Sequence, residues 1–476
     1  MIKRIIKILL IIFLVLVLAI SYLSVIGVKT DKFNNQITKN ILKINNKINL
    51  SLSDVNYLLN PYNLTINIKT KNPQLLLEGR ILGIKDIQTS VALKSLINDQ
   101  FLIDYLQITT KEIKLNDIIA SVRAFQNSPQ LFVLDTIIKD GFVIANINLN
   151  FDDKGKVKEN YNISGHVKKA KLNFLNQFKL KNVNLKFDIG KSIYSLKQID
   201  MRLNGIKITS PTIEIKKKKD SFSVNGQFLN DKKNFDIEEL KPIFSNLFNN
   251  KDIQKIEFSS KNNFSFNVRK NLKFNNFKVE SIIDLNNLIY NAKNLSLKTY
   301  FPNLVEEIKL EEHSIVINYN NNKLDIKGKG NILLDNKKDS LSYQITKDGN
   351  NISFDSKINL KKNSLLIDFL DYEKKEGLSS LVSLKGVFKE NNKLRFDLID
   401  LKEKNNKISI KGLVLSKNFK ITDIENFNIN YENKKNFLNK INLKKVNSNF
   451  IIEGESFDAS RIINNIIDSD EKSSSI

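Results

Sequence analysis

The stretch Phe264-Ser265-Phe266-Asn267-Val268 alternates apolar and polar side chains without a break. Successive side chains of a β-strand point to opposite faces, so strict alternation predicts a strand that is buried on one face only. Similar runs recur at residues 64–68, 142–147, 206–208, 314–319, 365–369 and 427–431. The sequence therefore predicts a mainly β fold.

The segments between these runs are short and rich in Asn, Lys and Asp, as at residues 152–155, 320–323, 347–350 and 391–393. Asn, Asp and Gly tolerate the positive φ angles that tight turns need. This order predicts an antiparallel meander, and about 12 residues per strand and turn give roughly 30 strands. A sheet with that many strands must curl, split or close. We expect an elongated, curled antiparallel β-sheet with a few short helices.

Four segments carry apolar residues at helical spacing instead. Residues 31–44 form an amphipathic stripe directly after the N-terminal apolar run, and residues 114–125 form a second candidate helix. The other two are residues 236–248 and residues 458–467, the latter with Asp458 as an N-cap. No further helix is predicted, and the polar tail from residue 468 is expected to be disordered.

The N-terminal run differs from everything that follows. Ile8 to Ile26 span 19 positions without a charged residue or a Pro. A helix of that length covers roughly 28 Å, which is close to the hydrocarbon thickness of a bilayer. The run is therefore predicted to cross a membrane.

The flanks of this run predict its orientation. Lys3, Arg4 and Lys7 precede it, so the positive-inside tendency keeps them in the cytoplasm and places the chain after Val28 on the far side. The alternative is a signal peptide that is cleaved near residues 19–21. The apolar run continues past these residues to Val28, which favours a retained anchor.

Composition excludes several kinds of chemistry. The chain has 476 residues with no Cys, no Trp and two His, so disulfides, thiolate metal sites and cysteine nucleophiles are excluded. The formal net charge is +24, carried by scattered basic residues. A positive surface suits anionic lipid headgroups or acidic polymers, but net charge alone indicates solubility and non-specific binding. No nucleic-acid partner is expected.

No catalytic constellation is found, so no enzyme, cofactor or metal site is predicted. His166 and His313 have no second His at ligand spacing. The acidic residues at 306, 307, 311 and 312 are interpreted as a solvated turn rather than an acid–base pair. Phosphate-binding glycine loops and nucleophile elbows are absent from the sequence.

A short signature recurs in which two apolar residues, each followed by any residue, precede a Gly. It ends at Gly79, Gly165, Gly226, Gly328, Gly386, Gly412 and Gly454. Glycine inside a strand marks a bulge, a bend or a close approach, and repeated glycines would let a long sheet curl into a trough. The alternative at any one site is an incidental glycine at a strand end.

Residues two and four positions before such a Gly share its face of the strand. We predict that ten of them line the trough: Phe222, Val224, Leu324, Ile326, Val382, Leu384, Ile408, Ile410, Phe450 and Ile452. Either side chains fill the interior of the curled sheet, or it encloses an apolar trough whose contents must themselves be apolar. Beside a membrane, acyl chains are the natural contents.

Several segments together resemble the AsmA-like family, in its YhdP-type branch. They are Leu50-Ser-Leu-Ser-Asp-Val55, Asn72-Pro-Gln-Leu-Leu-Leu-Glu-Gly79, Asn150-Phe-Asp-Asp-Lys-Gly155 and Phe450-Ile-Ile-Glu-Gly-Glu-Ser-Phe-Asp-Ala-Ser-Arg461. The resemblance implies a taco-like β-groove, anchored in the inner membrane of a diderm bacterium. In that setting the protein would move or hold phospholipid between the inner and outer membranes.

This interpretation divides the chain into an anchor (residues 1–30), an α+β region (31–130), an elongated β-groove (131–457) and a terminal helix with a tail (458–476). Family members continue beyond this point into a second β region. We therefore expect a separate envelope protein, or self-association, at the stripe of Ile462, Ile463, Ile466 and Ile467. The competing hypothesis is an assembly factor for outer-membrane biogenesis that binds polypeptides at exposed sheet edges.

Overall fold

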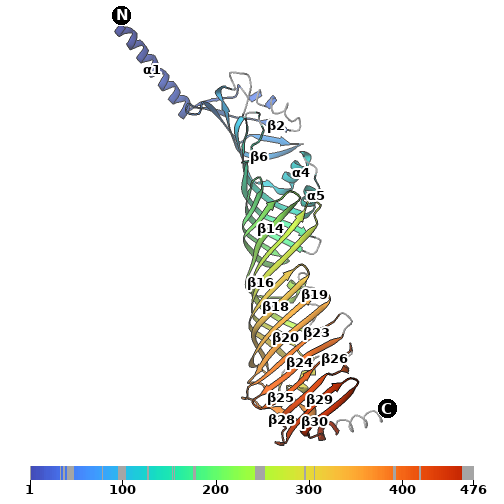
Figure 1. Ribbon diagram of the computed structural model, residues 1–476. Coiled ribbons are helices and arrows are strands. Elements are labelled where there is room, and N and C mark those ends of the chain that lie inside the picture. Colours follow the sequence, from blue (N-terminus) through green and yellow to red (C-terminus); the bar gives the residue numbers. More distant parts are fainter. Residues whose placement is uncertain are drawn as a thin grey trace. The chain divides into compact units, whose positions relative to one another are not determined.

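Figure 1 shows the computed structural model, in which antiparallel strands dominate. The structure describes the chain except residues 1, 33, 36–37, 40–47, 78, 95–102, 126–127, 153, 155, 175–177, 242–251, 294–295, 305, 390–392, 418–419 and 464–476. Helix α1 (Ile2–Val25) is followed almost at once by strand β1 (Val28–Thr30). The prediction of a mainly β fold after one apolar N-terminal helix is confirmed.

The chain divides into two compact units. Unit 1 comprises Met1–Gly226 and Asn267–Lys273, and unit 2 comprises Gln227–Phe266 and Phe274–Ile476. Strands β14 (Ser221–Phe235) and β15 (Ile253–Arg269) contribute residues to both units. The boundaries at residues 130 and 457 that the sequence suggested stay predictions.

The main ladder of unit 1 pairs antiparallel strands in the order β1–β3–β4–β6–β7–β9–β10–β11–β12–β13. Their bounds are β3 Val55–Asn60, β4 Thr65–Lys71, β6 Arg80–Ala92, β7 Ile103–Thr110, β9 Ile138–Asn150, β10 Asn162–Phe174, β11 Phe178–Ile189, β12 Ile193–Leu203 and β13 Ile206–Lys217. Strands β2 (Ile48–Ser51) and β5 (Gln74–Leu77) form a smaller ladder on the first part of β6. The two-residue strand β8 (Ile113–Lys114) pairs with β9.

Two helices of unit 1 lie next to each other in the chain. Helix α4 (Leu115–Phe125) confirms the second predicted helix, and its Ile119 is buried. Helix α5 (Pro129–Ile137) was not predicted, although Ser128 accepts a hydrogen bond from Leu131 and Pro129 occupies its first turn. A Ser followed by Pro is a helix start signal, so the sequence did contain the evidence for α5.

The other predicted helices are described only in part. In the first, Asn34, Asn35, Thr38 and Lys39 are helical. In the third, α6 (Ile237–Leu240) is capped by the Asp236 carboxylate, which accepts from the Glu238 N–H, and the rest of that predicted helix lies outside the described residues. Near the C-terminus residues 460–463 are helical, whereas Ile466, Ile467 and the tail are not described.

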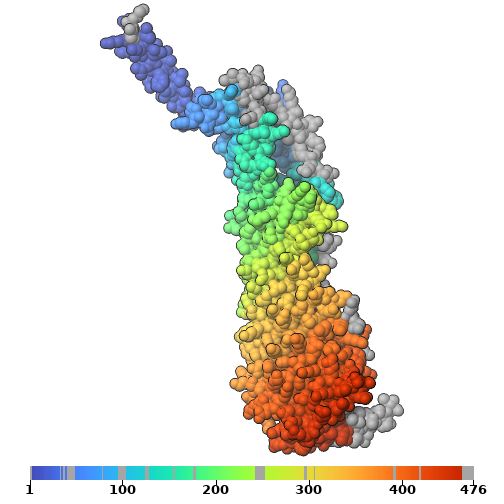
Figure 2. Space-filling model, in the orientation of Figure 1, coloured from blue at the N-terminus to red at the C-terminus, as the bar shows by residue number. Residues whose placement is uncertain are grey.

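The ladder of unit 2 pairs antiparallel strands in the order β16–β17–β18–β19–β20–β23–β24–β25–β28–β29–β30. Their bounds are β16 Phe274–Asn291, β17 Glu307–Asn320, β18 Lys323–Leu334, β19 Lys337–Asp348, β20 Asn351–Leu360, β23 Ser380–Phe388, β24 Leu394–Glu403, β25 Asn406–Lys411, β28 Asn426–Glu432, β29 Leu438–Val446 and β30 Asn449–Ser456. Strands β26 (Leu413–Leu415) and β27 (Ile421–Asp423) extend this ladder beside β24. The colours of unit 2 in Figure 2 run towards red in chain order, as a meander requires.

Between β20 and β23 the chain leaves the ladder. Residues 361–379, which we call the insert, contain β21 (Leu365–Ile367), the 3-10 turn η2 (Asp368–Leu370) and β22 (Tyr372–Lys374). Strands β21 and β22 pair only with each other among the described strands. A second 3-10 turn, η1 (Ser296–Thr299), lies between β16 and β17.

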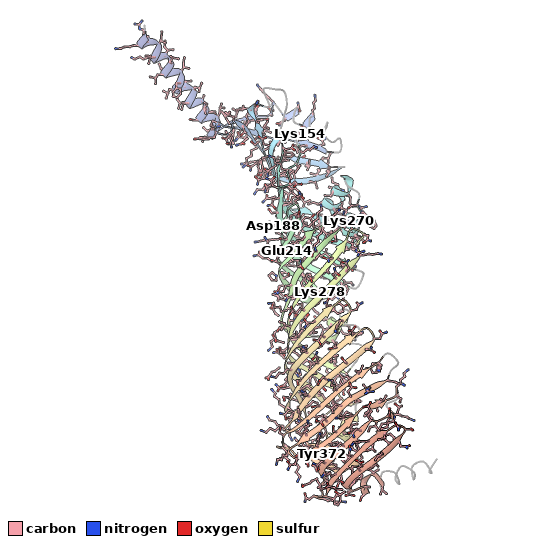
Figure 3. All side chains as sticks on the ribbon, viewed as in Figure 1. Lys154, Asp188, Glu214, Lys270, Lys278 and Tyr372 are labelled. Atoms are coloured by element: carbon pink, nitrogen blue, oxygen red, sulfur yellow. The ribbon has the colours of Figure 1, made fainter. Side chains whose placement is uncertain are left out.

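Register gives each ladder one apolar and one polar face. In unit 1, one row of paired residues is Ile87, Ile108, Ile147, Ile163, Ile189, Tyr194 and Ile215. The adjacent row on the opposite face contains Asp188, Ser195 and Glu214, of which Asp188 and Glu214 are labelled in Figure 3. Period-two alternation therefore survives pairing across several strands.

The glycines of the recurring signature mark both close approaches and irregular pairing. A Cβ at Gly328 would lie 2.2 Å from the Tyr343 ring, and one at Gly386 would lie 2.8 Å from the Phe354 ring. Aromatic rings from neighbouring strands thus lie across these glycines. Gly386 and Gly454 also lie at register shifts, and Gly412 has a φ of 63° between β25 and β26. Further irregularities lie at Lys169 and Asn182, which adopt positive φ angles where the registers of β10 and β11 shift. Such bulges bend and twist a strand.

We predict that Gly386→Ala destabilises unit 2. The new methyl group would lie 2.3 Å from the Arg395 carbonyl oxygen, so the backbone must shift. Overpacking of this kind costs about 1–3 kcal/mol in the free energy of unfolding. Urea titration followed by circular dichroism measures it. Gly190→Ala is the matched control, because its nearest neighbour would be 3.7 Å away. Equal unfolding midpoints for the two variants would contradict the prediction.

Candidate functional site

Ordinary pairing accounts for the reactive side chains of the described residues. No group of three His, Asp or Glu residues that could hold a metal ion is found among them. Lys338 pairs with both Glu311 and Glu312. Lys293 donates to Glu306 and holds the pKa of that carboxyl below its usual range. The acidic residues therefore form surface ion pairs. The predicted turn is wrong for Glu307, Glu311 and Glu312, because all three lie in strand β17.

The main structural feature of unit 2 is its apolar face. We call its central line of paired residues the middle row: Ile283, Ile315, Gly328, Tyr343, Ser356, Leu384, Ile399, Ile410, Phe427, Leu443 and Ile452. Ser356 is its one polar member. The row crosses every strand of the ladder from β16 to β30 without changing face.

Two further rows run parallel to the middle row on the same face. The outer row is Ser281, Ile317, Ile326, Ile345, Phe354, Gly386, Phe396 and Leu413. The rim row is Val279, Tyr319, Leu324, Lys347, Ile352, Phe388, Leu394, Leu415 and Ile421. Residues two apart on a strand lie about 7 Å apart, so three rows make an apolar band about 14 Å wide.

Aromatic rings extend the rim row towards β14. Phe277 meets Tyr319 with 5.8 Å between ring centroids, and Phe266 meets Phe277 at 6.0 Å. Phe264 and Phe228 continue the series, stacked at 4.7 Å. Phe277 nevertheless remains 43% exposed. Large apolar surface of this kind is unusual on a face that has no partner.

Exposure separates the middle row from its neighbour on the other side. Apart from buried Gly328 and exposed Ile452, middle-row residues are half-buried. We call the neighbouring line the core row: Leu285, His313, Leu341, Ile358, Val382, Leu401, Ile408, Ile429 and Ile441. Leu285, Leu401, Ile408 and Ile429 in it are at most 6% exposed.

The insert is the reason why part of the core row is buried. Leu365, Leu370 and Tyr372 from the insert form one hydrophobic cluster with Leu401, Ile408 and Ile429 of the ladder. The Tyr372 ring meets the Tyr431 ring edge-on at 5.5 Å, and the Tyr431 hydroxyl donates to the Leu370 carbonyl oxygen. The insert therefore covers the ladder at the core row and leaves the middle row half-buried.

A polar network fixes the insert in place. Asp339 accepts the backbone N–H groups of Lys361, Lys362 and Asn363. Buried Lys374 donates to the carbonyl oxygens of Asn363 and Lys361 at 2.5 and 3.1 Å. Each of these bonds joins groups that would otherwise be buried without a partner.

Burial shifts the pKa of two groups in this network. Burial lowers the pKa of Lys374, although the carboxylates of Asp339 and Glu403 oppose the shift. Burial, together with its hydrogen bond to Glu403, raises the pKa of Tyr372, which is labelled in Figure 3. A satisfied, low-dielectric network of this kind rigidifies the region that contains it. We assign it a structural role.

Seven of the ten predicted trough residues belong to these four rows. Leu384, Ile410 and Ile452 belong to the middle row, Ile326 to the outer row and Leu324 to the rim row. Val382 and Ile408 belong to the core row, where Ile408 is buried and Val382 packs against the same cluster. With Phe450, two positions before Ile452 on the same strand, unit 2 thus brings eight of the predicted residues onto one face.

Phe450 and Ile452 are the exposed members of this set, at 51% and 64%, on β30, which pairs only with β29 among the described strands. Phe222 and Val224 belong to unit 1, where Val224 is buried and the Phe222 ring lies 6.3 Å from the Tyr194 ring.

Sequence reasoning missed the rest of the middle row, including Ile315, Ile399, Phe427 and Leu443. A signal was present, because each lies in a strand with alternating apolar residues. Finding them required the register between strands, which the search for glycines did not supply.

The C-terminal segment is tied to the insert. Asp458 accepts from the Ser460 N–H, as the predicted N-cap should, and its own N–H donates to Asn439. Arg461 lies 3.7 Å from Asp371. Ile462 is half-buried and Ile463 is 52% exposed.

Comparison of the chain with protein-family models, curated proteins and solved structures gives no match.

We predict that His313 makes unit 2 less stable in mild acid. His313 Nε2 donates to the Asn331 carbonyl oxygen at 2.9 Å, which leaves the buried Nδ1 without a partner. Burial lowers the pKa of His313, while the bond to Asn331 partly opposes this. Below about pH 6.5 the unfolded chain gains a proton here that the folded chain does not, so stability falls until the lowered folded pKa is reached.

Urea titrations between about pH 7 and pH 5 test this prediction. The wild type should lose more stability over this range than His313→Gln does. His166→Gln is the control, since the chain has only these two histidines. Parallel pH profiles for the wild type and His313→Gln would count against the prediction.

Proposed function

We propose that the chain is a membrane-anchored, non-enzymatic protein that binds lipid acyl chains along the apolar face of unit 2 and holds or conducts them. The observation that supports this most directly is the middle row, which is continuous, almost wholly apolar and half-buried. A face of this size requires apolar contents or an apolar partner.

The dimensions and chemistry of the face favour chain-like ligands. The middle row crosses ten gaps between strands, which corresponds to about 48 Å at 4.8 Å per gap. The side chains of the middle row offer dispersion contacts and little hydrogen bonding, because Ser356 is the only aliphatic residue in this row with a hydroxyl group. Such a surface would recognise hydrocarbon length rather than a polar headgroup.

The N-terminal helix supports attachment to a membrane. Within Lys3–Val25 the most apolar window of 18 residues has a mean hydropathy of 3.1, and none of that window is buried against the rest of the chain. These properties fit an anchor or a signal sequence. We propose a retained single-pass anchor in a bacterial inner membrane, with a cytoplasmic N-terminus and a periplasmic bulk.

The proposal extends to the setting that the AsmA-like resemblance implies. In that setting the cargo is phospholipid, which moves between the inner and outer membranes. A separate envelope protein would meet the C-terminal end, where Ile463 is 52% exposed beside Arg461.

The exposed edge strand β30 supports a second candidate function. Phe450, Ile451 and Ile452 are all at least 44% exposed there. An exposed apolar edge can bind another polypeptide by strand addition. An assembly factor for outer-membrane biogenesis would use this edge and would not need the half-buried rows.

Substitutions at two nearby positions on β25 distinguish an effect on lipid binding from an effect on folding. We predict that Ile410→Asp keeps the strand signal but reduces co-purifying lipid several-fold, because Ile410 is half-buried in the middle row. Ile408→Asp should unfold unit 2, since an unpaired charge in a buried site costs several kcal/mol, on the order of 2–7. Circular dichroism and mass spectrometry of extracted lipid measure the two effects.

Asn430→Asp is the matched control, because it adds the same charge on the exposed polar face of β28. It should change neither lipid content nor melting. Unchanged lipid in folded Ile410→Asp would reject the lipid-binding proposal and favour the edge-binding one.

Topology gives an independent prediction. A reporter that is active only in the periplasm, fused after Thr30, should be active, because Lys3, Arg4 and Lys7 precede the apolar helix. Activity of a cytoplasmic reporter alone at the same site would reverse the proposed orientation. Release of the fusion as a soluble protein would show that the helix is cleaved as a signal sequence.

A further inference from the structure

The hairpin between β3 and β4 lies beside the end of α1. Strand β1 pairs with β3 in antiparallel register, with Val28 opposite Tyr57. A Cβ at Gly27 would lie 2.4 Å from the Tyr57 carbonyl oxygen, so the chain leaving α1 passes directly over β3. In Figure 1 this part of unit 1 lies at the base of the helix.

The register of β1 and β3 shows how far the turn after β3 extends along the strand direction past the end of α1. Strand β1 runs away from α1, so antiparallel β3 runs towards it. Asn60 lies three residues beyond Tyr57, and the turn at residues 61–64 follows. At 3.3 Å per residue the turn lies about 10 Å past the level of Val28, on the side where α1 ends. If α1 spans a bilayer, the turn is therefore level with the membrane surface.

Two large side chains of the turn are strongly exposed to solvent. Tyr62 is 96% exposed and Leu64 is 64% exposed. Leu64 also has a φ of 49°, in the left-handed region where Asn or Gly is usual. A bulky L-residue rarely adopts this conformation, because its Cβ lies too close to the following carbonyl oxygen. An exposed leucine in a strained conformation indicates a role outside the fold itself.

The backbone of the turn has partners within the protein. The Asn60 side chain accepts from the N–H groups of Tyr62 and Asn63 at 3.2 and 3.3 Å. The Leu64 carbonyl oxygen accepts from the Leu93 N–H at 2.9 Å. Backbone groups must be paired internally wherever a segment enters an apolar phase. This turn meets that condition at these three groups.

Cationic side chains accompany the turn. Exposed Lys94 directly follows Leu93, and exposed Lys29 lies on β1 one residue after Val28. Tyrosine at the headgroup level, with flanking lysines that reach anionic headgroups, is typical of residues at a membrane interface.

We propose that the turn at residues 61–64 inserts Tyr62 and Leu64 into the interface of the bilayer that α1 spans. The contact would hold the first strands of unit 1 against the membrane at a second point beside the helix. This inference rests on the anchoring part of the proposed function and does not depend on lipid binding by unit 2.

The absence of Trp from the sequence makes a direct test available. Tyr62→Trp introduces a single tryptophan at a site that is 96% exposed, so the fold is not disturbed. The full chain is reconstituted into vesicles of phosphatidylcholine and phosphatidylglycerol, with and without lipids brominated on the acyl chains. Ile81→Trp is the control: Ile81 is 69% exposed near the opposite end of β6, about 35 Å along that strand from Ala92 beside the turn.

Both variants should float with the vesicles, which establishes anchoring. The tryptophan of the Tyr62→Trp variant should then emit at shorter wavelength and lose at least half of its intensity to brominated lipid, whereas that of the Ile81→Trp variant should lose little. Vesicle-bound chain in which both tryptophans respond alike, with strong quenching by aqueous iodide, would overturn the inference and leave the anchor intact. Failure of both variants to float would overturn the anchor and this inference together, while the lipid measurement on Ile410→Asp would still stand.

Discussion

Strand register is the constraint on which unit 2 depends. Because side chains alternate with a period of two, a slip of one residue would move all the apolar residues of a strand to the polar face. Hairpin turns with left-handed residues, such as Asn321 and Asn322 between β17 and β18, set the register from strand to strand. Each correctly set hairpin extends the same rows, so the apolar band follows directly from local turn chemistry.

One part of this apolar face is covered by another segment of the chain, and another part is not. At the core row, the insert covers it with Leu365, Leu370 and Tyr372, and a satisfied polar network holds the insert in position. At the middle row the side chains stay half-buried. Glycines on the neighbouring strands leave room for the rings of Tyr343 and Phe354 to lie across those strands. Covered and uncovered rows therefore occur side by side on the same strands.

The sequence predicted the parts of the fold that depend on local pattern. Helix α1, the strands, and α4 followed from apolar periodicity. Helix α5 was missed because its apolar residues read as strand, although Ser128 and Pro129 marked its start. The glycines were expected to mark bulges or bends, and Gly386 and Gly454 do lie at register shifts. Lys169 and Asn182, which supply left-handed positions at other shifts, carry no such signature in the sequence.

The candidate site was predicted in kind but not in detail. Val382 and Leu384 have the same alternation in sequence, yet one packs against the insert cluster and the other lies in the half-buried middle row. The difference arises from residues 361–379, which return to cover the ladder chiefly at the core row, although Phe427 of the middle row also packs against their cluster. No local pattern in β23 records that contact, because it is made by a segment that pairs with no strand of the ladder among the described residues.

The ion pairs of the polar face cannot explain why the apolar face stays half-buried. Pairs such as Lys197 with Asp188 are about half exposed on both sides, and exposed pairs contribute about 0–1 kcal/mol each. Burial of apolar area, at about 25 cal/mol per Å², is the larger source of stability. The insert shows that this sequence can bury a row of the ladder when it supplies a covering segment. A chain shaped by stability alone would gain from covering the middle row in the same way, and this contrast is the physical basis of our proposal that the band binds an apolar ligand.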